Sequence, residues 1–129
     1  MNVYIKDEKN FKGVFATRGM TKGDIVVSMT RPTSKLVRTP TRTSIQISEG
    51  YYVEDEVGAC INHACNPTCE VRSFLVIASR DIEEGEEITF DYNKNEDVVV
   101  SPFKCNCCGK MILGRKHEQK TTESRDERG

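Results

Sequence analysis

The sequence predicts a small, mainly β domain with little helix. Short apolar runs rich in β-branched and aromatic residues recur along the chain, and glycines and charged clusters separate them. This pattern is typical of antiparallel strands joined by tight turns. At 129 residues the chain has room for one hydrophobic core and little more. We therefore expect one domain built from several short strands.

Six runs are the expected strands. They cover residues 3–5, 13–17, 24–29, 44–47, 73–79 and 87–92. Helix is expected only as one or two turns within "EDEVGACI" (54–61), where early acidic residues favour a helix start and Gly58 weakens it. Residues 30–43 carry four basic residues, no acid and two prolines, and we expect a loop there. Residues 117–129 contain no apolar side chain, which indicates a disordered tail.

Composition excludes several classes of function. Nineteen Lys and Arg against twenty Asp and Glu give a net charge of −1, so overall charge does not favour direct nucleic-acid binding. No apolar run approaches the roughly 20 residues that span a membrane, and no signal peptide is apparent. We expect an intracellular protein, in which six cysteines are thiols or metal ligands rather than disulfides. Nucleotide-binding glycine loops and a G-x-S-x-G elbow are absent from the sequence.

The segment "FKCNCCGK" is a candidate structural zinc site. Cys105 and Cys108 have the C-x-x-C spacing of a zinc knuckle, and a tetrahedral zinc needs further ligands from elsewhere. Cys65 and Cys69, in "INHACNPTCEV", are the available donors about forty residues upstream. Spacing alone leaves the ligand set open, with Cys107 as a further member.

Taken in order, three segments resemble the SET-domain family of protein lysine methyltransferases. "INHACNPTCEV" is similar to the family's N-H-S-C-x-P-N signature, "GEEITFDYN" to its G-E-E-[LI]-x-[FY]-D-Y segment, and "FKCNCCGK" to its cysteine-rich post-SET region. "KGVFATRGMTKGDIV" also resembles the opening hairpin of that family. The likeness runs from about Lys12 to about Gly114 and implies a SET domain over 1–100, a post-SET-like cysteine segment over 101–114 and a charged tail over 115–129.

The resemblance implies a β-clip of several small sheets, with a threaded C-terminal segment that brings "NH" beside the tyrosine strand. It also implies S-adenosylmethionine as cofactor and a protein or peptide substrate, such as a histone tail, whose lysine enters a narrow channel from the opposite side. Tyr92 is then the expected catalytic residue. The residues carried over to the cofactor site are Lys12, Gly13, Val14, Asn62, His63 and Tyr92, and those carried over to the substrate channel are Phe90, Tyr51 and Tyr52.

The resemblance also favours a zinc held by Cys65, Cys105, Cys107 and Cys108, although the family's third post-SET cysteine is replaced here by Ile112. A set of Cys65, Cys69, Cys105 and Cys108 stays open as the alternative. Phe11 stands where the family has the first glycine of its hairpin. The region between Met29 and His63 is short, so specificity is expected from residues 31–42, from a homodimer or from a partner protein. A catalytically inactive SET-like peptide-binding module is the competing hypothesis.

Overall fold

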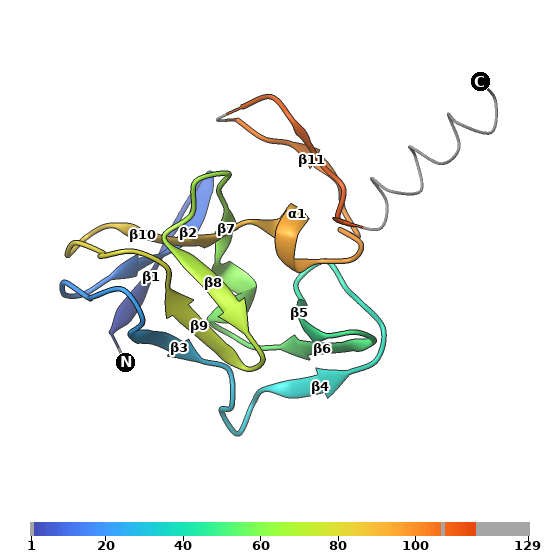
Figure 1. Ribbon diagram of the computed structural model, residues 1–129, viewed down its shortest axis with the longest axis horizontal. Coiled ribbons are helices and arrows are strands. Elements are labelled where there is room, and N and C mark those ends of the chain that lie inside the picture. Colours follow the sequence, from blue (N-terminus) through green and yellow to red (C-terminus); the bar gives the residue numbers. More distant parts are fainter. Residues whose placement is uncertain (1, 107, 116–129) are drawn as a thin grey trace.

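The protein folds into several small β-sheets around one core. The computed structural model describes residues 2–106 and 108–115 (Figure 1). One sheet has the strand order β1-β2-β10-β7, two three-stranded sheets have the orders β3-β9-β8 and β4-β6-β5, and β11 pairs with β12. The expectation of a mainly β chain with little helix is confirmed.

The first sheet begins with the longest hairpin of the described chain. β1 (Val3–Glu8) pairs antiparallel with β2 (Phe11–Ala16), and β2 pairs in turn with β10 (Glu87–Phe90). The fourth strand, β7 (Asn62–His63), has only two residues and runs parallel to β10, with Thr89 opposite Asn62 and Phe90 opposite His63. This register sets the "NH" pair directly beside the segment that leads into Tyr92.

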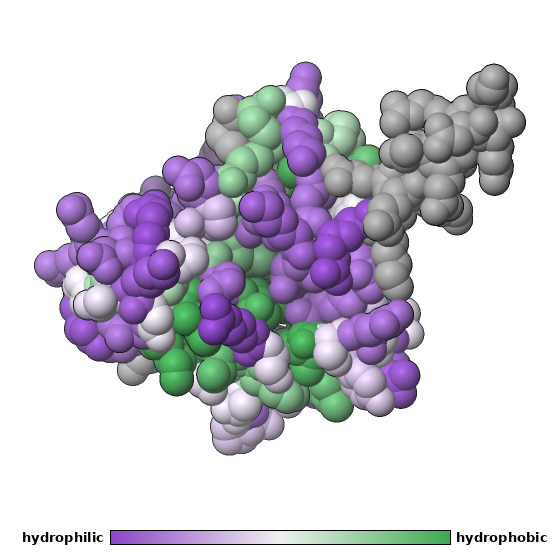
Figure 2. Space-filling view, viewed as in Figure 1, coloured by the Kyte–Doolittle hydropathy of each residue, from purple (hydrophilic) through white to green (hydrophobic). Residues whose placement is uncertain are grey.

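The two three-stranded sheets form the rest of the body. β3 (Ile25–Ser28), β8 (Cys69–Arg72) and β9 (Leu75–Ala78) make one sheet, and β4 (Lys35–Val37), β5 (Ile45–Ser48) and β6 (Tyr51–Glu54) make the other. Figure 2 shows that apolar surface gathers over these strands, where Ile25 and Leu36 are more than half exposed.

The core joins the three larger sheets. Its fully buried apolar side chains come from strands of each sheet and from the segment before β7, and they include Val14, Val27, Val53, Ile61, Val76 and Ile88. Because each strand is short, its inward positions bury apolar area that no single sheet could cover alone. Among the described residues, no helix is long and apolar enough to cross a membrane.

Three local expectations need correction. The predicted loop over 30–43 contains β4, whose backbone pairs antiparallel with β6 so that β4 forms one edge of that sheet. The predicted strand over 87–92 ends at Phe90, because Asp91 caps a one-turn helix, α1 (Tyr92–Asn95), by accepting from the Asn93 N–H at 2.9 Å. The one or two helical turns expected within 54–61 are a single 3₁₀ turn, Gly58–Cys60, which begins after the acidic residues expected at its start.

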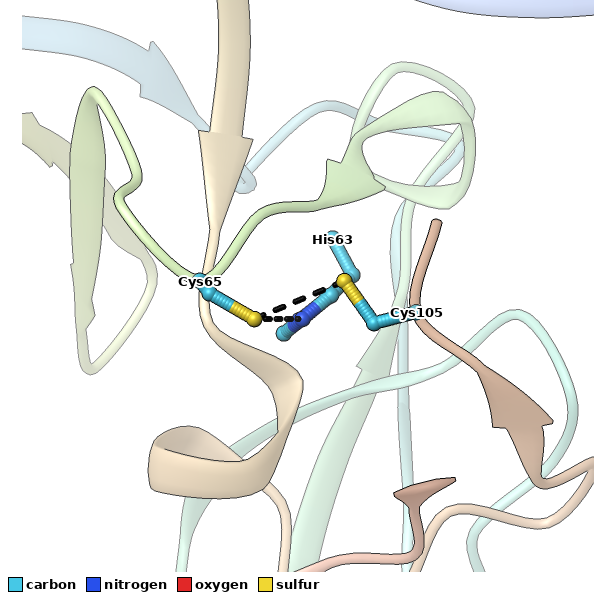
Figure 3. A group of neighbouring side chains, drawn as sticks. All are labelled: His63, Cys65 and Cys105. Atoms are coloured by element: carbon cyan, nitrogen blue, oxygen red, sulfur yellow. Dashed lines mark hydrogen bonds between the residues drawn. The ribbon is translucent and has the colours of Figure 1, made fainter. Parts of the chain in front are cut away.

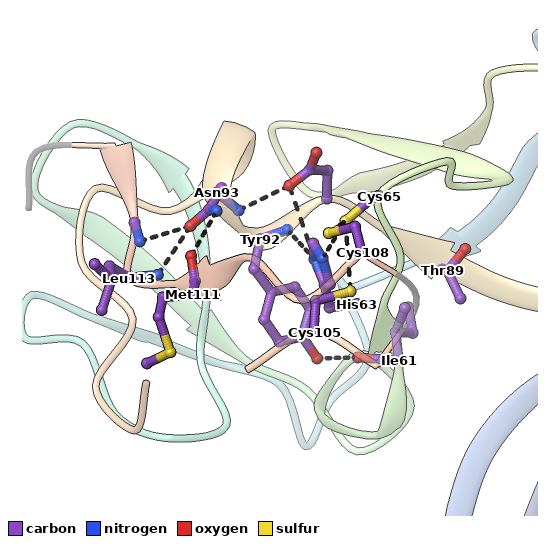
Figure 4. A network of polar contacts seen from close by, with 12 residues as sticks. Ile61, His63, Cys65, Thr89, Tyr92, Asn93, Cys105, Cys108, Met111 and Leu113 are labelled. Carbon is purple, nitrogen blue, oxygen red and sulfur yellow. Dashed lines mark hydrogen bonds and ion pairs between the residues drawn. The ribbon is translucent and has the colours of Figure 1, made fainter. Parts of the chain in front are cut away.

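After α1 the chain folds back over the site. β11 (Phe103–Lys104) and β12 (Met111–Ile112) form a short hairpin. The Asn93 side chain fastens this segment, since its Oδ1 accepts from the N–H groups of Leu113 and Gly114 at 2.9 Å each (Figure 4). Residue 107 and the expected tail beyond residue 115 lie outside the described residues.

Candidate functional site

Two cavities of different size meet at Tyr92. The larger, of about 510 Å³, is an open cleft between the β2 turn, β7 and the β11 segment, and it is lined in part by Lys12, Asn62, His63 and Tyr92. The smaller, of about 40 Å³, lies between the 41–45 segment, the 3₁₀ turn and the 96–100 segment, and Phe90 and Tyr92 also line it. A volume of 40 Å³ holds on the order of three water molecules. Tyr92 is thus the residue through which a ligand in one cavity can meet a group in the other.

Asn62 is fixed in the wall of the larger cleft. Its Nδ2 donates to the backbone oxygen of Lys12 at 2.7 Å and to Glu87 Oε2 at 2.8 Å. The amide oxygen of Asn62 is left to accept from a ligand. Gly13 fits tightly between these groups, since an added Cβ would lie 2.9 Å from Glu87 Oε2 and from the Phe11 ring. Gly13 and Val14, expected at the cofactor site, are not among the described residues that line the cleft, and the side chain of Val14 is fully buried in the core.

His63 has both ring nitrogens engaged. The Tyr92 N–H donates to His63 Nδ1 at 3.0 Å, and Nε2 lies 3.5 Å from Cys65 Sγ. A ring nitrogen that accepts a hydrogen bond carries no proton, so we assign the proton of the neutral ring to Nε2. His63 then donates to the sulfur of Cys65. The ring connects the Tyr92 backbone to the cysteine cluster and does not have a free nitrogen for acid–base work.

Tyr92 presents a neutral hydroxyl at the junction of the cavities. Its O–H donates to the backbone oxygen of Ile61 at 2.5 Å (Figure 4). Burial raises the pKa of Tyr92 well above its usual range, and the negative charges of Glu96 and Glu87 raise it further. With its proton directed to Ile61, the hydroxyl oxygen keeps lone pairs that can accept from a group in either cavity. The Tyr92 ring packs against the ring of Phe90, with 4.9 Å between centroids, and against the ring of Phe103, with 5.9 Å between centroids.

The smaller pocket has an apolar wall and few charges. Ile61 and Phe90 are almost fully buried there, and Glu96 is the one carboxyl group among the described residues that line the pocket. Tyr51 and Tyr52, expected at a substrate channel, are not among these lining residues. Tyr51 lies beneath the Arg38 guanidinium, 4.1 Å from carbon to ring centroid, and Tyr52 is buried on β6.

Three cysteines meet at the edge of the larger cleft. Cys65 Sγ lies 3.4 Å from Cys105 Sγ and 3.0 Å from Cys108 Sγ, and Figure 3 shows Cys65 and Cys105 pointing toward each other beside His63. His63, Cys65 and Cys105 together have the spacing of a metal-ligand group. The protonated Nε2 of His63 makes it a donor to Cys65 in this arrangement, so we count the sulfur atoms alone as metal ligands.

Thiolate sulfur is the preferred donor of structural zinc, and Cys65 has a sulfur neighbour in each of Cys105 and Cys108. Cys108 lies outside the compact group that His63, Cys65 and Cys105 form among the described residues. Cys107, the fourth expected ligand, lies outside the described residues. Cys69, the open alternative, is 1% exposed in the hydrophobic core on β8, where it pairs with Ala78. Its thiol is not part of the metal-ligand group found among the described residues.

Sequence reasoning missed three residues at the site. Glu87 fixes Asn62, Phe103 covers the rings of His63 and Tyr92, and Glu96 lines the smaller pocket. The sequence did hold a signal for Phe103, because a zinc shared by Cys65 and Cys105 would draw residue 103 toward the "NH" pair, and the two sulfur atoms do lie 3.4 Å apart. Glu96 follows Tyr92 by four residues. That spacing brings the two residues together only if a helical turn begins at Tyr92, and the sequence predicts a strand there.

Comparisons with known proteins point to one family. The family model described as SET domain matches residues 12–93. Over 95 residues the chain is 32% identical to a histone-lysine N-methyltransferase of Aspergillus oryzae described as H3 lysine-36 specific, covering 61% of this chain and 10% of that protein. Over 80 residues it is 38% identical to the methyltransferase flvH of Aspergillus flavus, covering 57% of this chain and 44% of that protein.

The fold is also found among solved structures. A Plasmodium falciparum protein described as a histone methyltransferase superposes with a TM-score of 0.54 at 20% identity, covering 70% of this chain and 92% of that one. This likeness confirms the fold class that the sequence resemblance implied. The chain spans less than half of the length of the two Aspergillus relatives.

Proposed function

The chain belongs to the SET-domain family, and on that premise we propose that it is an S-adenosylmethionine-dependent protein lysine methyltransferase. The observation that carries the proposal is the meeting of a large cleft and a small pocket at Tyr92. Such an arrangement suits a reaction in which two molecules enter from opposite sides and exchange one small group.

The larger cleft is the proposed cofactor site. Its volume of about 510 Å³ lies within the 300–1,000 Å³ of typical small-molecule sites. The Asn62 amide oxygen can accept from the cofactor's ammonium group, and Lys12 and His63, which also line the cleft, can supply further backbone contacts. Phe103 offers an aromatic face against which an adenine ring can stack. When bound, the cofactor supplies a methyl group on positively charged sulfur.

In this proposal Tyr92 orients the incoming lysine amine. Methyl transfer requires nitrogen, methyl carbon and sulfur in line, and orientation of this kind can supply several of the roughly 7–11 kcal/mol available from proximity. The hydroxyl oxygen accepts from the amine or from the polarised methyl group, because its own proton is held by Ile61. The raised pKa of Tyr92 keeps this oxygen neutral and excludes tyrosinate as the proton acceptor.

Phe90 is the proposed determinant of product. Its ring is 3% exposed and packs against Tyr92 at 4.9 Å between centroids. A phenylalanine has no hydroxyl with which to hold a water where a second or third methyl would go, so we expect dimethyl or trimethyl product. Mass spectrometry of a modified peptide checks this, and monomethyl product alone would contradict it.

The proposed zinc holds the β11 segment over the cofactor cleft. Cys65 follows the cleft residues Asn62, His63 and Ala64 in the chain, and Cys105 lines the cleft from the β11 side, so metal bound between these two cysteines would tie the two walls together. With Cys107 as the fourth ligand, the set is the one expected from the family resemblance. Zinc has a structural role here and takes no part in methyl transfer.

A protein lysine, of a histone or of another protein, is the proposed substrate. Of the basic residues in 31–42, Arg31 is paired with buried Asp55 at 2.6 Å, and Arg38 donates to the backbone oxygen of Gly50 at 2.8 Å. Lys35 and Arg42 are exposed, and Arg42 also lines the small pocket. These two can contact acidic residues beside the target lysine. An intracellular location and a homodimer stay predictions.

Transfer of isotope from labelled cofactor tests the proposed function. The protein is incubated with methyl-labelled S-adenosylmethionine and a mixture of histones and cell lysate, and label is sought on lysine after digestion. We expect label on lysine, and we expect Asn62→Ala to weaken cofactor binding measured by calorimetry. Cofactor binding without transfer to any protein would instead support an inactive peptide-binding module.

A further inference from the structure

Tyr92 orients the lysine in the proposed reaction, but no residue has been assigned to remove the proton of the lysine ammonium group. A lysine side chain has a pKa of about 10.4 and is an ammonium group at neutral pH, so it must lose a proton before it attacks. The Tyr92 hydroxyl cannot accept that proton, because it is itself protonated and donates to the Ile61 oxygen. Both nitrogens of His63 are engaged by Tyr92 and Cys65, and His63 does not line the small pocket.

Glu96 lies where a proton acceptor would have to be. It is 6% exposed and lines the small pocket together with Tyr92 and Phe90. Glu96 follows Tyr92 by four residues at the end of α1, and its backbone N–H donates to the backbone carbonyl oxygen of Tyr92 at 2.8 Å. Both residues line the same pocket, and the negative charge of Glu96 acts on the Tyr92 hydroxyl. An ammonium group beside the Tyr92 hydroxyl is therefore near a buried carboxylate.

Hydrogen bonds hold the Glu96 carboxylate in one orientation. The Gln46 N–H lies 2.9 Å from Oε2 and 3.2 Å from Oε1, and Asn95 Nδ2 donates to Oε2 at 2.6 Å. Oε2 thus accepts hydrogen bonds from two donors, and Oε1 shares the Gln46 N–H with Oε2. Since each carboxylate oxygen has two acceptor positions, Oε1 keeps the capacity to accept one more proton.

We propose that Glu96 is the general base for the target lysine, a role that rests on the proposed function. The N–H bond of the ammonium group breaks and an O–H bond forms at Glu96. The neutral amine then attacks the methyl carbon, the carbon–sulfur bond breaks, and its electron pair returns to sulfur to give the neutral thioether. The product leaves as a methylated ammonium group, and the proton on Glu96 passes to solvent.

The electrostatics of the pocket agree with this role. Burial raises the pKa of Glu96 to about 7, against the lowering effect of the Gln46 amide and the Asn95 side chain. Among charged neighbours, Asp97 raises it and Arg115 lowers it. Arg42 lines the same pocket from the opposite segment. A general base works best when its pKa is near the working pH, and an exposed glutamate near 4.3 would be a weaker acceptor.

The pH dependence of kcat/KM for lysine transfer tests the proposal. For wild-type protein, kcat/KM should decrease as the pH falls below about 7, because Glu96 is a carboxylate only above that pH. Glu96→Gln should lose roughly 10²-fold at pH 7.5, the lower end for general-base catalysis. In Glu96→Gln the acidic limb of the kcat/KM profile should move toward the pKa of the free lysine amine. The deficit in kcat/KM relative to wild type should therefore shrink as the pH approaches about 10. Glu84→Gln, which removes the same charge from an exposed turn, should behave as wild type.

A less basic lysine analogue, aminoethylcysteine in the same peptide, gives a second measurement that does not depend on how the variant folds. With Glu96 as base, the acidic limb of the wild-type protein stays in place when the analogue replaces lysine. In Glu96→Gln the limb moves to lower pH with the less basic amine. A wild-type limb that follows the basicity of the amine overturns the proposal, as does a Glu96→Gln deficit that is equal at every pH.

The same experiments separate this inference from the proposed function. If wild-type protein binds the cofactor but labels no lysine at any pH, the proposed function fails first. If wild-type protein transfers methyl groups while Glu96→Gln keeps activity within threefold at pH 7.5, only the assignment of Glu96 fails. Cofactor binding and the melting temperature of Glu96→Gln, measured alongside, show whether loss of the Gln46 contact has altered the fold.

Discussion

Replacing Asp55 by asparagine tests how the chain is held as it enters the site. Asp55 is 3% exposed, and its carboxylate accepts from Arg31 Nη1 at 2.6 Å, from Ser34 Oγ at 2.5 Å and from the N–H groups of Val57 and Gly58 at 3.1 and 2.9 Å. These contacts pin the 31–34 turn to the 3₁₀ turn that leads into β7. Asparagine has the same shape, but it lacks the charge and replaces one acceptor oxygen with a donor.

Removing one partner of a buried ion pair costs roughly 3–5 kcal/mol. The Arg31 side chain is 21% exposed and can be partly hydrated, so we expect the lower end, about 3 kcal/mol. For a chain of this length, at about 4 °C per kcal/mol, the melting temperature should fall by roughly 12 °C. Urea unfolding followed by circular dichroism gives the free energy, and calorimetry gives the melting temperature.

The pH dependence gives a second check on Asp55. Burial alone would raise its pKa, but hydrogen bonds from Ser34 and Gly58 and the charge of Arg31 lower it overall. A lowered pKa means that the stabilisation is present above the unfolded value near 3.9 and is lost as pH falls below it. The difference between wild type and Asp55→Asn should therefore narrow below pH 4.

A matched control is Asp7→Asn, at an exposed pair with Lys12 that spans 3.8 Å. This change should cost less than about 0.5 kcal/mol, because exposed ion pairs contribute little. If Asp55→Asn also costs less than 1 kcal/mol, or if its effect is the same at every pH, the role given to the Asp55 carboxylate is wrong.

Three further predictions concern the cysteines and the C-terminal turn. Cys65→Ser should lower the bound zinc measured by mass spectrometry, whereas Cys69→Ser should retain it; the reverse order would refute the ligand assignment. After metal removal, Cys69 should alkylate at least 100-fold more slowly at pH 8 than exposed Cys108, because burial raises the pKa of Cys69 to about 11; equal rates would contradict its placement in the core. Gly114→Ala should lower the free energy of unfolding by more than the roughly 1–2 kcal/mol that left-handed backbone costs a non-glycine residue, since its Cβ would lie 2.6 Å from the Asp97 backbone oxygen. Gly23→Ala, at a similar positive φ but in open space, should lower it by only that amount. Similar losses of unfolding free energy in the two variants would count against the clash at Gly114.

Much of the sheet structure could be predicted from the sequence, because its signal is local. The runs at 13–17, 24–29, 44–47 and 73–79 each overlap an observed strand, because β-branched and aromatic residues bounded by turn residues favour a strand locally. β7 could not be found in this way. Asn62 and His63 are polar, and their strand exists only because it pairs with Thr89 and Phe90, about 27 residues later in the chain.

The site was predicted in part. Lys12, Asn62, His63 and Tyr92 do line one cleft, but this juxtaposition came from resemblance to a family and not from any local pattern. The same resemblance suggested Tyr51 and Tyr52, which the structure places on β6 outside both cavities at Tyr92. Which residues would face a substrate depends on how residues 30–61 pack against the rest of the fold. This region is short, so positions in it could not be assigned by resemblance. The helix at Tyr92 did carry a local signal, the Asp91 cap.

The central claim is that Tyr92 orients a lysine amine for methyl transfer, and kinetics of Tyr92→Phe test it most directly. Tyr92→Phe should lose about 10²-fold in kcat, the cost of a misplacement of roughly 1 Å in the lysine amine. The dissociation constant for S-adenosylmethionine should stay within a factor of about three, since the ring and its contacts with Phe90 and Phe103 are retained. A variant that binds the cofactor and transfers methyl groups at the wild-type rate would contradict the account.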